Sequence, residues 1–265
     1  MAEMTHFKDV TLLITHYNRC KSLERLLKAF KDLNCSFDDI VVSDDASGEE
    51  HLTYIKSLHG TYNFRLITTP VNGGLGNNIN KGQDAVETPY TLYIQEDFIP
   101  KKDFPLHFID AFNIMEENEK WDLISLYAYS PYPYMIPYKL GFSEKIFKGG
   151  LRYMQNLKFF LYSDHPHLRR STFLQKFGRY AEGVNVDVAE MDMSLSFIKN
   201  KGKSLFYNDH YSLLTQDNPE DEPSTATFRK SLKNDGTLPI IVAKWVYSKI
   251  KFLKLNLQLL TKKST

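Results

Sequence analysis

The first 130 residues alternate between short apolar runs and stretches in which apolar residues recur at helical spacing. The apolar runs lie at residues 10–14, 40–42, 64–68, 90–94 and 123–127. Continuous apolar runs of this length are typical of strands that are buried on both faces. The helical spacing occurs at residues 22–33, 47–58, 77–86 and 105–117. This alternation predicts an α/β fold in which helices flank both faces of a mostly parallel sheet.

Beyond residue 130 the pattern becomes irregular. Residues 131–162 are rich in Tyr, Phe, Pro and Gly, which favours a long loop or lid with aromatic surfaces. Helical spacing returns at residues 170–177 and 191–199, and a strand is predicted at 204–207. The second half of the chain is therefore expected to have fewer regular elements than the first.

The C-terminal segment differs from the rest in composition. Residues 217–224 are acidic and contain proline, which indicates a surface linker, and residues 240–263 mix lysines with aromatic and aliphatic residues. We predict one catalytic domain at 1–216, followed by this linker and a basic amphipathic helical segment at 217–265. That segment has two interpretations: a helix packed on the domain with solvated lysines, or a helix resting on an anionic membrane surface.

Composition narrows the class of protein. The chain has 265 residues, 42% of them hydrophobic, which is enough for one large core. Its 33 Lys+Arg and 32 Asp+Glu leave a formal charge of +1, so nothing favours a nucleic-acid partner. Cys20 and Cys35 cannot form a disulfide framework and have no metal-ligand spacing. Because no signal peptide or run of about 18 apolar residues is found, a cytoplasmic location is expected.

Polar side chains follow three of the predicted strands. Residues 15–18 (Thr-His-Tyr-Asn) end the first strand, 44–47 (Asp-Asp-Ala-Ser) end the second, and 95–97 (Gln-Glu-Asp) end the fourth. A loop that runs from Asn72 to Gly76 precedes the third helix. Taken singly, the first two groups also suit simple turns or helix caps, and a lone glycine-rich loop is a weak signal. The carboxyl ends of parallel strands are nevertheless where α/β sheets bind ligands.

The pair Glu96-Asp97 is the group that is hardest to explain as a simple turn. Two carboxylates at the end of a buried strand repel one another, and a cation or several hydrogen bonds must offset this repulsion. Paired carboxylates can hold Mg²⁺ or Mn²⁺, and such an ion can neutralise a diphosphate. The pair therefore predicts a divalent-cation site.

Taken in order, these segments resemble the family 2 glycosyltransferases with the GT-A fold, most clearly over residues 9–100. The resemblance implies a Rossmann-like domain with a nucleotide-sugar half (about 9–100) and an acceptor half (about 101–216). It assigns Thr15, Tyr17 and Asp45 to the nucleobase, with Asn72 in the loop beside the phosphates. The family's Asp-x-Asp or Asp-Asp pair, which binds the ribose and the metal, maps onto Glu96 and Asp97. Since Glu replaces the first Asp, Asp97 is the preferred metal ligand.

Two further assignments come from the same resemblance. Residues 190–195 (Glu-Met-Asp-Met-Ser-Leu) resemble the family's Glu-Asp-x-x-Leu, whose Asp removes the proton from the acceptor hydroxyl. The spacing selects Asp192 as this base, while Met191 in place of the usual Glu leaves Glu190 as the alternative. Both acids also suit the first turn of a helix. A late histidine completes the metal shell in many enzymes of this fold, which makes His210 a third candidate ligand.

The predicted function is metal-dependent, inverting transfer from a nucleotide-diphospho sugar, a UDP-sugar, to a glycan or glycolipid acceptor. The family suggests synthesis of lipopolysaccharide or another surface polysaccharide, at the cytoplasmic face of the membrane. A nucleotidyltransferase is one alternative, although that class has a Gly-rich loop with Arg or Lys directly after the first strand, where this chain has residues 16–19 (His-Tyr-Asn-Arg). A non-catalytic module that binds nucleotide sugars is the other.

Overall fold

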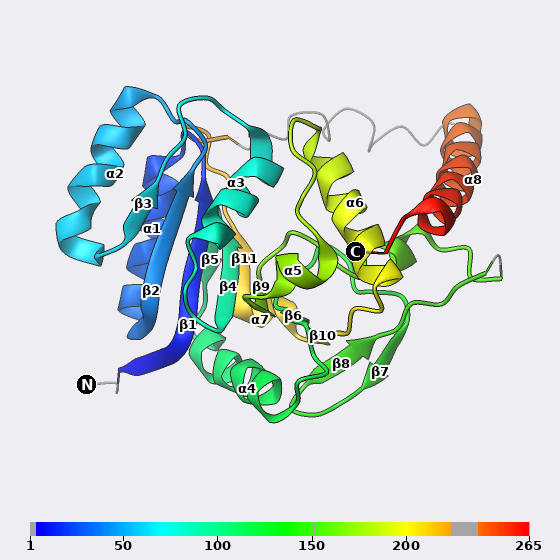
Figure 1. Ribbon diagram of the computed structural model, residues 1–265, viewed down its shortest axis with the longest axis horizontal. Helices are drawn as coiled ribbons and strands as arrows, with labels where there is room; N and C mark the ends of the chain where they lie inside the picture. Colours follow the sequence, from blue (N-terminus) through cyan, green and yellow to red (C-terminus); the bar gives the residue numbers. More distant parts are fainter. Residues whose placement is uncertain (1–3, 151, 224–237, 265) are drawn as a thin grey trace.

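The structure, a computed structural model, describes residues 4–150, 152–223 and 238–264, and its centre is one mixed sheet (Figure 1). The strand order is β3-β2-β1-β4-β9-β6-β10-β8-β7. The strands of this sheet are β1 (Thr5–His16), β2 (Cys35–Asp44), β3 (Arg65–Ile67), β4 (Tyr90–Gln95), β6 (Leu123–Ser125), β7 (Met135–Pro137), β8 (Phe142–Lys145), β9 (His167–Arg170) and β10 (Ser204–Tyr207). A separate antiparallel pair consists of β5 (Phe98–Pro100) and β11 (Leu214–Gln216).

Helices connect the strands and cover the sheet. They are α1 (Cys20–Asp32), α2 (Glu49–Tyr62), α3 (Gly74–Asp84), α4 (Phe104–Glu117), α5 (Phe173–Phe177), α6 (Val186–Lys199), α7 (His210–Leu213) and α8 (Leu238–Thr261), with a 3₁₀ turn, η1, at Asn156–Phe159. The predicted α/β architecture with a C-terminal helix is confirmed. Among the described residues, none of these helices is both long and apolar enough to cross a membrane.

The two halves of the sheet are built differently. Strands β3, β2, β1 and β4 are all parallel. Beyond them, β9 runs antiparallel to both β4 and β6, and β8 runs antiparallel to β10 and β7. The sequence predicts a helix from residue 170 onward, and it does not predict β9. The reason is that β9 is polar in sequence yet buried: the guanidinium of Arg169 donates to Gln83 Oε1 and the Tyr180 hydroxyl inside the core.

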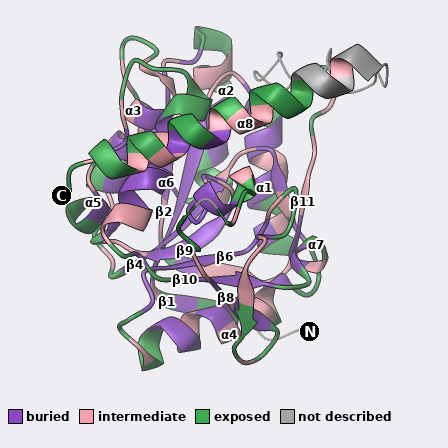
Figure 2. Ribbon diagram, turned by 90° about the vertical axis from the view of Figure 1, so that its right-hand side faces the viewer, coloured by how far each residue is buried: buried purple, intermediate pink, exposed green. Residues whose placement is uncertain are grey.

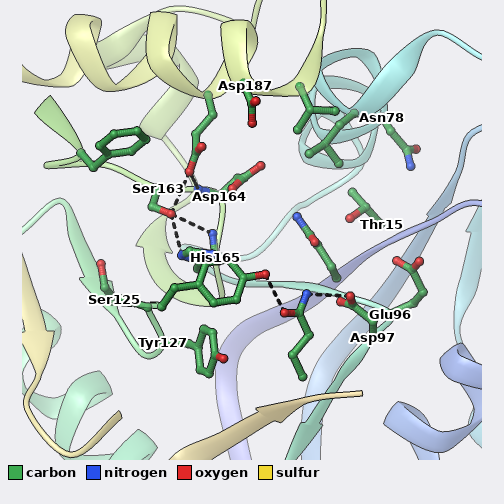
Figure 3. Close-up of a pocket in the computed structure, with 18 of the residues that line it drawn as sticks. Thr15, Asn78, Glu96, Asp97, Ser125, Tyr127, Ser163, Asp164, His165 and Asp187 are labelled. Atoms are coloured by element: carbon green, nitrogen blue, oxygen red, sulfur yellow. Dashed lines mark hydrogen bonds between the residues drawn. The ribbon is translucent and has the colours of Figure 1, made fainter. Parts of the chain in front are cut away.

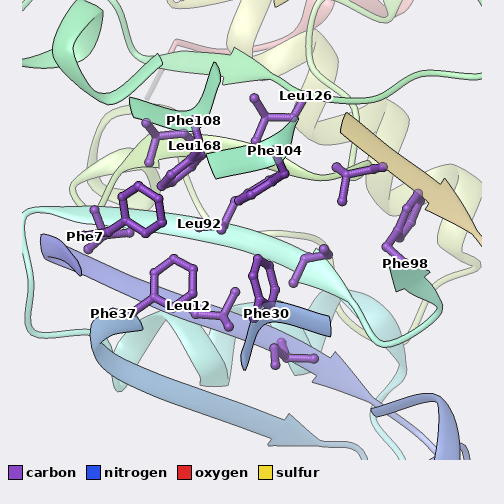
Figure 4. Packing of buried hydrophobic residues seen from close by; sticks show 14 of the residues in the cluster. Phe7, Leu12, Phe30, Phe37, Leu92, Phe98, Phe104, Phe108, Leu126 and Leu168 are labelled. Carbon is purple, nitrogen blue, oxygen red and sulfur yellow. The ribbon is translucent and has the colours of Figure 1, made fainter. Parts of the chain in front are cut away.

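The core lies on both faces of the sheet because side chains alternate along β1. Leu12 and Ile14 belong to a cluster on one face, in which Phe104 and Phe108 stack with ring centroids 5.2 Å apart (Figure 4). Leu13 points to the other face and belongs to a second cluster. Burial on both faces holds β1 rigidly, and its carboxyl end with it.

Helix α8 packs against α6 and η1 on one side of the molecule (Figure 2). Phe252 and Leu255 are buried there against Phe159 and Leu195. The predicted linker begins differently from expectation, since Glu222 is buried against α1 and its carboxylate accepts the backbone N–H of Ser22 at 2.7 Å. Ser224, the last residue of that predicted linker, lies outside the described residues, as do residues 225–237. Residues 131–162, predicted as a loop, contain β7, β8 and η1.

Candidate active site

A cavity of about 750 Å³ opens at the carboxyl ends of β1, β2 and β4. In Figure 3, Thr15, Glu96 and Asp97 lie on one side, and Ser125, Ser163 and His165 lie on the other. The first group comes from the parallel half of the sheet and the second from the mixed half. All but one of the predicted nucleotide and metal residues line this cavity: Thr15, Tyr17, Asp45, Asn72, Glu96 and Asp97 do, and His210 does not.

A buried hydrogen-bond network fixes the ends of β1 and β2. His16 Nε2 accepts the backbone N–H of Arg19, so His16 Nδ1 carries the proton and donates it to Asp44 Oδ1 at 2.8 Å. Burial raises the pKa of Asp44, but hydrogen bonds from His16 and Ser47 outweigh burial and bring the pKa below its ordinary value. Asp44 is thus a charged structural anchor, which leaves the neighbouring Asp45 to face the cavity.

Asp45 positions the glycine-containing loop. Its two carboxylate oxygens accept the backbone N–H groups of Gly73 and Gly74 at 2.8 and 2.9 Å. The Gly74 N–H also contacts Asn72 Oδ1 at 3.1 Å. Gly74 has a φ of +80°, a conformation that L side chains rarely adopt. A carboxylate has about four acceptor positions, so Asp45 retains the capacity to accept a ligand N–H.

Arg19 lies beside both members of the acidic pair. Its Nη1 is 3.2 Å from Glu96 Oε1 and 3.3 Å from Asp97 Oδ2. Burial and repulsion by Asp97 still raise the pKa of Glu96 to about 8, although Arg19 acts in the opposite direction. Sequence reasoning did not assign Arg19. The signal that indicates it is the uncompensated charge of the pair, combined with a cation two residues after Tyr17.

Asp97 is held by Gln216 of β11, the strand that pairs with β5. Gln216 Nε2 donates to Asp97 Oδ2 at 2.8 Å, and Gln216 Oε1 accepts the Tyr129 hydroxyl at 2.6 Å (Figure 3). The second oxygen, Asp97 Oδ1, is buried and has no hydrogen-bond partner within the described ranges. A buried acceptor without a partner is costly, and its presence here indicates a missing ligand.

The first turn of α6 forms the far wall of the cavity. Asn185 caps this helix by accepting the backbone N–H of Asp187, and Asp187 and Glu190 both line the cavity. Glu190 Oε1 accepts the Ser163 hydroxyl at 2.9 Å and the backbone N–H of Asp164 at 3.2 Å. Ser163 Oγ also lies 2.8 Å from His165 Nδ1. The carboxylate of Glu190 is therefore held at the cavity by two donors of one segment, Ser163 and Asp164.

The structure places Asp192 and Glu190 in different surroundings. Residues two apart on a helix lie about 200° apart around its axis, so both cannot face the same cavity. Asp192 is not among the cavity residues, and its Oδ1 pairs with Lys262 Nζ at 2.5 Å. Of the two predicted bases, Glu190 is therefore the one that lines the cavity, and the choice of base stays a prediction.

His210 is not placed with the acidic pair either. It is buried outside the residues that line the cavity, with its ring 4.9 Å from Phe206 and 6.0 Å from Tyr127. Within the part of the chain that the structure describes, only Cys20, His51 and Glu222 form a group of three metal-ligating side chains whose ligand atoms all lie within 4.8 Å of one another. The geometry thus leaves Asp97 as the better supported of the two metal candidates.

Comparisons with known proteins agree with this geometry. The family model described as Glycosyl transferase family 2 matches residues 11–177, more than half of the chain. Poly-beta-1,6-N-acetyl-D-glucosamine synthase of Staphylococcus epidermidis is 21% identical over 111 residues, which are 42% of this chain. The match spans only 27% of that relative's length.

Two solved structures share the fold. S. aureus TarS 1-349 in complex with UDP-GlcNAc aligns with a TM-score of 0.58 and 16% identity, covering 80% of this chain and 59% of that one. Mannosyltransferase PcManGT from Pyrobaculum calidifontis, in complex with GDP-Man and Mn2+, aligns with a TM-score of 0.56 and 11% identity, covering 96% and 76%. The fold is thus GT-A-like, as in TarS. With the family match across both halves of the cavity, the conclusion is that this chain belongs to glycosyl transferase family 2.

Proposed function

We propose that this protein is an inverting glycosyltransferase that moves a sugar from a UDP-sugar to a hydroxyl group of a glycan or glycolipid. The observation that carries the proposal is that one cavity is lined by Asp45, the pair Glu96-Asp97 and Glu190. Such a cavity offers an acceptor for a nucleobase N–H, a site beside the diphosphate, and a base for the acceptor hydroxyl. A volume of about 750 Å³ suits a nucleotide sugar.

The nucleotide binds along the parallel half of the sheet in this proposal. Thr15 and Tyr17 contact the base, and Asp45 accepts its imide N–H. The loop that starts at Asn72 lies beside the phosphates, because Asp45 holds its backbone in place. The UDP-GlcNAc and GDP-Man of the two solved structures support a nucleotide sugar, and the acceptor positions that remain on the buried Asp45 suit the imide N–H of uracil.

The residues around Asp97 fit a divalent cation. The unpartnered Asp97 Oδ1 is a hard oxygen ligand of the kind that Mg²⁺ and Mn²⁺ prefer. Asp97 would hold the ion, with Glu96 beside it, and the ion would neutralise the charge of the diphosphate. Arg19 adds a second, permanent positive charge at the same place. The Mn2+ of the PcManGT complex supports this part of the proposal.

Glu190 is the general base in the proposed reaction. The acceptor hydroxyl gives its proton to the Glu190 carboxylate, and its oxygen forms a bond to the anomeric carbon. The bond from that carbon to the diphosphate oxygen breaks at the same time, and its electron pair leaves with the diphosphate. Ser163 and the Asp164 N–H orient Glu190. One displacement with no enzyme nucleophile inverts the anomeric configuration.

The acceptor side of the cavity suits a sugar. Tyr127, Tyr129 and Phe160 line it, and flat aromatic side chains offer apolar faces for sugar rings. The proposed acceptor is a cell-surface polysaccharide or lipopolysaccharide, which the name of the S. epidermidis relative supports.

A screen of nucleotide sugars with Mn²⁺ tests the activity. UDP-sugars should raise the melting temperature, since saturation at 100 times Kd stabilises a protein by about 2.7 kcal/mol. At least one of them should also be hydrolysed slowly. GDP-sugars are the matched control. Stabilisation without hydrolysis or transfer to any glycan would favour a non-catalytic binding module, and no response to any nucleotide would contradict the proposal.

We further propose that α8 rests on an anionic membrane. Its buried face carries Phe252 and Leu255, while an opposite stripe is exposed to solvent. The stripe is formed by Val246, Ile250, Leu253, Leu257 and Leu260, which are 42–76% exposed. Lys249 and Lys254 flank it on the two sides of the helix. An exposed apolar stripe between lysines suits a surface of anionic lipid.

A second copy of α8 is the competing occupant, since the stripe has the 4-3 spacing of a helix-pairing seam. The flanking lysines of two copies would then face one another, which disfavours that pairing. Sedimentation with vesicles tests the choice: the protein should bind phosphatidylglycerol vesicles and not phosphatidylcholine vesicles. Ile250→Ser with Leu257→Ser should abolish binding and leave the buried face of α8 intact. Equal binding by this variant, or a dimer in solution that the variant dissociates, would contradict the membrane proposal.

A further inference from the structure

Lys145 is a buried cation in the half of the cavity away from the acidic pair. It is the last residue of β8, it is 5% exposed, and it lines the cavity. Its Nζ donates to Ser125 Oγ at 2.9 Å. Figure 3 shows Ser125 across the cavity from Glu96 and Asp97. Lys145 therefore belongs to the part of the site that receives the transferred sugar and the acceptor.

The charge of Lys145 is not compensated by the protein. No described carboxylate lies within ion-pair distance of its Nζ, in contrast to the equally buried Arg19, which pairs with Glu96 and Asp97. An ammonium has three N–H donors, and one hydroxyl satisfies only one of them. Tyr132 adds only a distant ring, with its centroid 5.9 Å from Nζ.

Burial without a counterion has a measurable consequence. It lowers the pKa of Lys145 to about 7. A lysine kept only for packing would be replaced at lower cost by an apolar side chain, because unpaired buried charge destabilises the fold. Lys145 lines the cavity, so a bound group can supply the missing charge.

We propose that Lys145 and Ser125 form a subsite for an anionic group, a carboxylate or a phosphate, on the transferred sugar or on the acceptor. This assignment rests on the proposed glycosyl transfer, and it narrows the substrate class to one that carries a negative charge beyond the donor diphosphate. The Lys145 ammonium pairs with the anion, and the Ser125 hydroxyl donates a second hydrogen bond to it. Charge-assisted hydrogen bonds of this kind are about twice as strong as neutral ones.

Two matched substrate pairs distinguish the sources of the anion. UDP-glucose and UDP-glucuronate differ only in the carboxylate of the sugar. Glucose and glucose 6-phosphate, added as acceptor probes to the protein saturated with UDP, differ only in the phosphate. The protein should prefer the anionic member of one pair by about tenfold or more in Kd. Lys145→Met should remove this preference and Lys145→Arg should retain it, while both variants bind UDP as the wild type does.

The outcomes separate this inference from the proposed function. UDP binding with no preference in either pair, or a preference that persists in Lys145→Met, overturns the anion subsite alone. A wild-type protein that does not bind UDP overturns the proposed function and the subsite with it. Preference in the glucuronate pair places the anion on the donor sugar, and preference in the phosphate pair places it on the acceptor.

Discussion

The two walls of the cavity differ in how they are assembled. The nucleotide wall consists of the ends of neighbouring parallel strands, where Thr15 lies at the end of β1 and Asp45 directly follows β2. The acceptor wall brings together β6, β8, the segment around Ser163 and the start of α6. The strands of the first wall are neighbours in the sheet and run in the same direction. The second wall consists of segments that are far apart in the sequence.

The two walls also differ in whether their charged side chains have partners within the protein. On the nucleotide wall Arg19 pairs with Glu96 and Asp97, and His16 donates a hydrogen bond to Asp44. On the acceptor wall Lys145 has no carboxylate partner among the described residues. The comparison indicates that the charged groups of one wall are largely paired within the protein, whereas the other wall leaves a buried lysine that a ligand can pair with.

The largest expected effect separates two acids on the acceptor wall. Glu190→Gln should lower kcat by about 10²–10⁴-fold, the usual contribution of a general base, and leave the affinity for UDP unchanged. Asp192→Asn is the matched control and should change kcat by less than about threefold, because Asp192 pairs with Lys262 outside the cavity. Single-turnover transfer and calorimetry with UDP measure both quantities. A larger loss in Asp192→Asn would return the base to that residue.

A smaller effect is expected on the nucleotide wall. Asp97→Asn should weaken UDP-sugar binding in Mn²⁺ by at least about tenfold, since even an outer partner of a metal ligand contributes about 10–100-fold. The loss should vanish when Mn²⁺ is withheld. Glu96→Gln should cost less, because Arg19 already pairs with Glu96. Calorimetry that finds equal donor affinity in Asp97→Asn and wild type would refute the metal assignment.

The same contrast explains what the sequence predicts well. Every strand and helix up to residue 117 except β5 is predicted, although β1 and β2 begin about five residues before the predicted apolar runs, because each buried strand contains a continuous apolar run that ends in polar residues. The acceptor wall is predicted poorly. Strand β9 is short and polar, and Arg169 is buried only because Gln83 and Tyr180 bind it. Whether a buried charge finds hydrogen-bond partners depends on contacts between residues that are far apart in the sequence. The spacing of hydrophobic residues does not reveal such contacts.

The candidate site follows the same division. Thr15, Asp45 and Asp97 are found from strand ends, since position in a parallel sheet determines where those side chains meet. The sequence alone could not decide between Glu190 and Asp192, because the choice depends on which side of α6 faces the cavity. Lys145 was missed because an isolated lysine on a four-residue strand carries no signal until its burial is known.

A glycine at the junction of the two walls tests how tightly they are joined. A Cβ on Gly76 of α3 would lie 2.4 Å from the carbonyl oxygen of Ala181, which is backbone and cannot rotate away. Gly76→Ala should therefore lower the free energy of unfolding by about 1–3 kcal/mol. Gly60→Ala is the control: nothing lies within 4 Å of its Cβ, and helix propensity predicts a gain of about 0.5–1 kcal/mol. Urea denaturation measures both, and a neutral Gly76→Ala would mean that α3 can move away from the backbone at Ala181 at little cost.

The last prediction concerns the pH dependence of the uncompensated charge. The pKa of Lys145 is about 7 in the folded protein and 10.5 without burial, so below pH 7 both states carry the proton and the full cost of burying the charge is present. Between pH 7 and 10.5 the folded state loses the proton first, and the cost declines. Lys145→Met should thus raise the free energy of unfolding by about 1 kcal/mol or more at pH 6, with a smaller gain at pH 9.

The exposed Lys56→Met is the control and should change the free energy of unfolding by less than about 0.5 kcal/mol at either pH. Denaturation curves in which Lys145→Met is less stable than wild type at pH 6 would show that the protein itself compensates this lysine, and the distinction between the two walls would fail there.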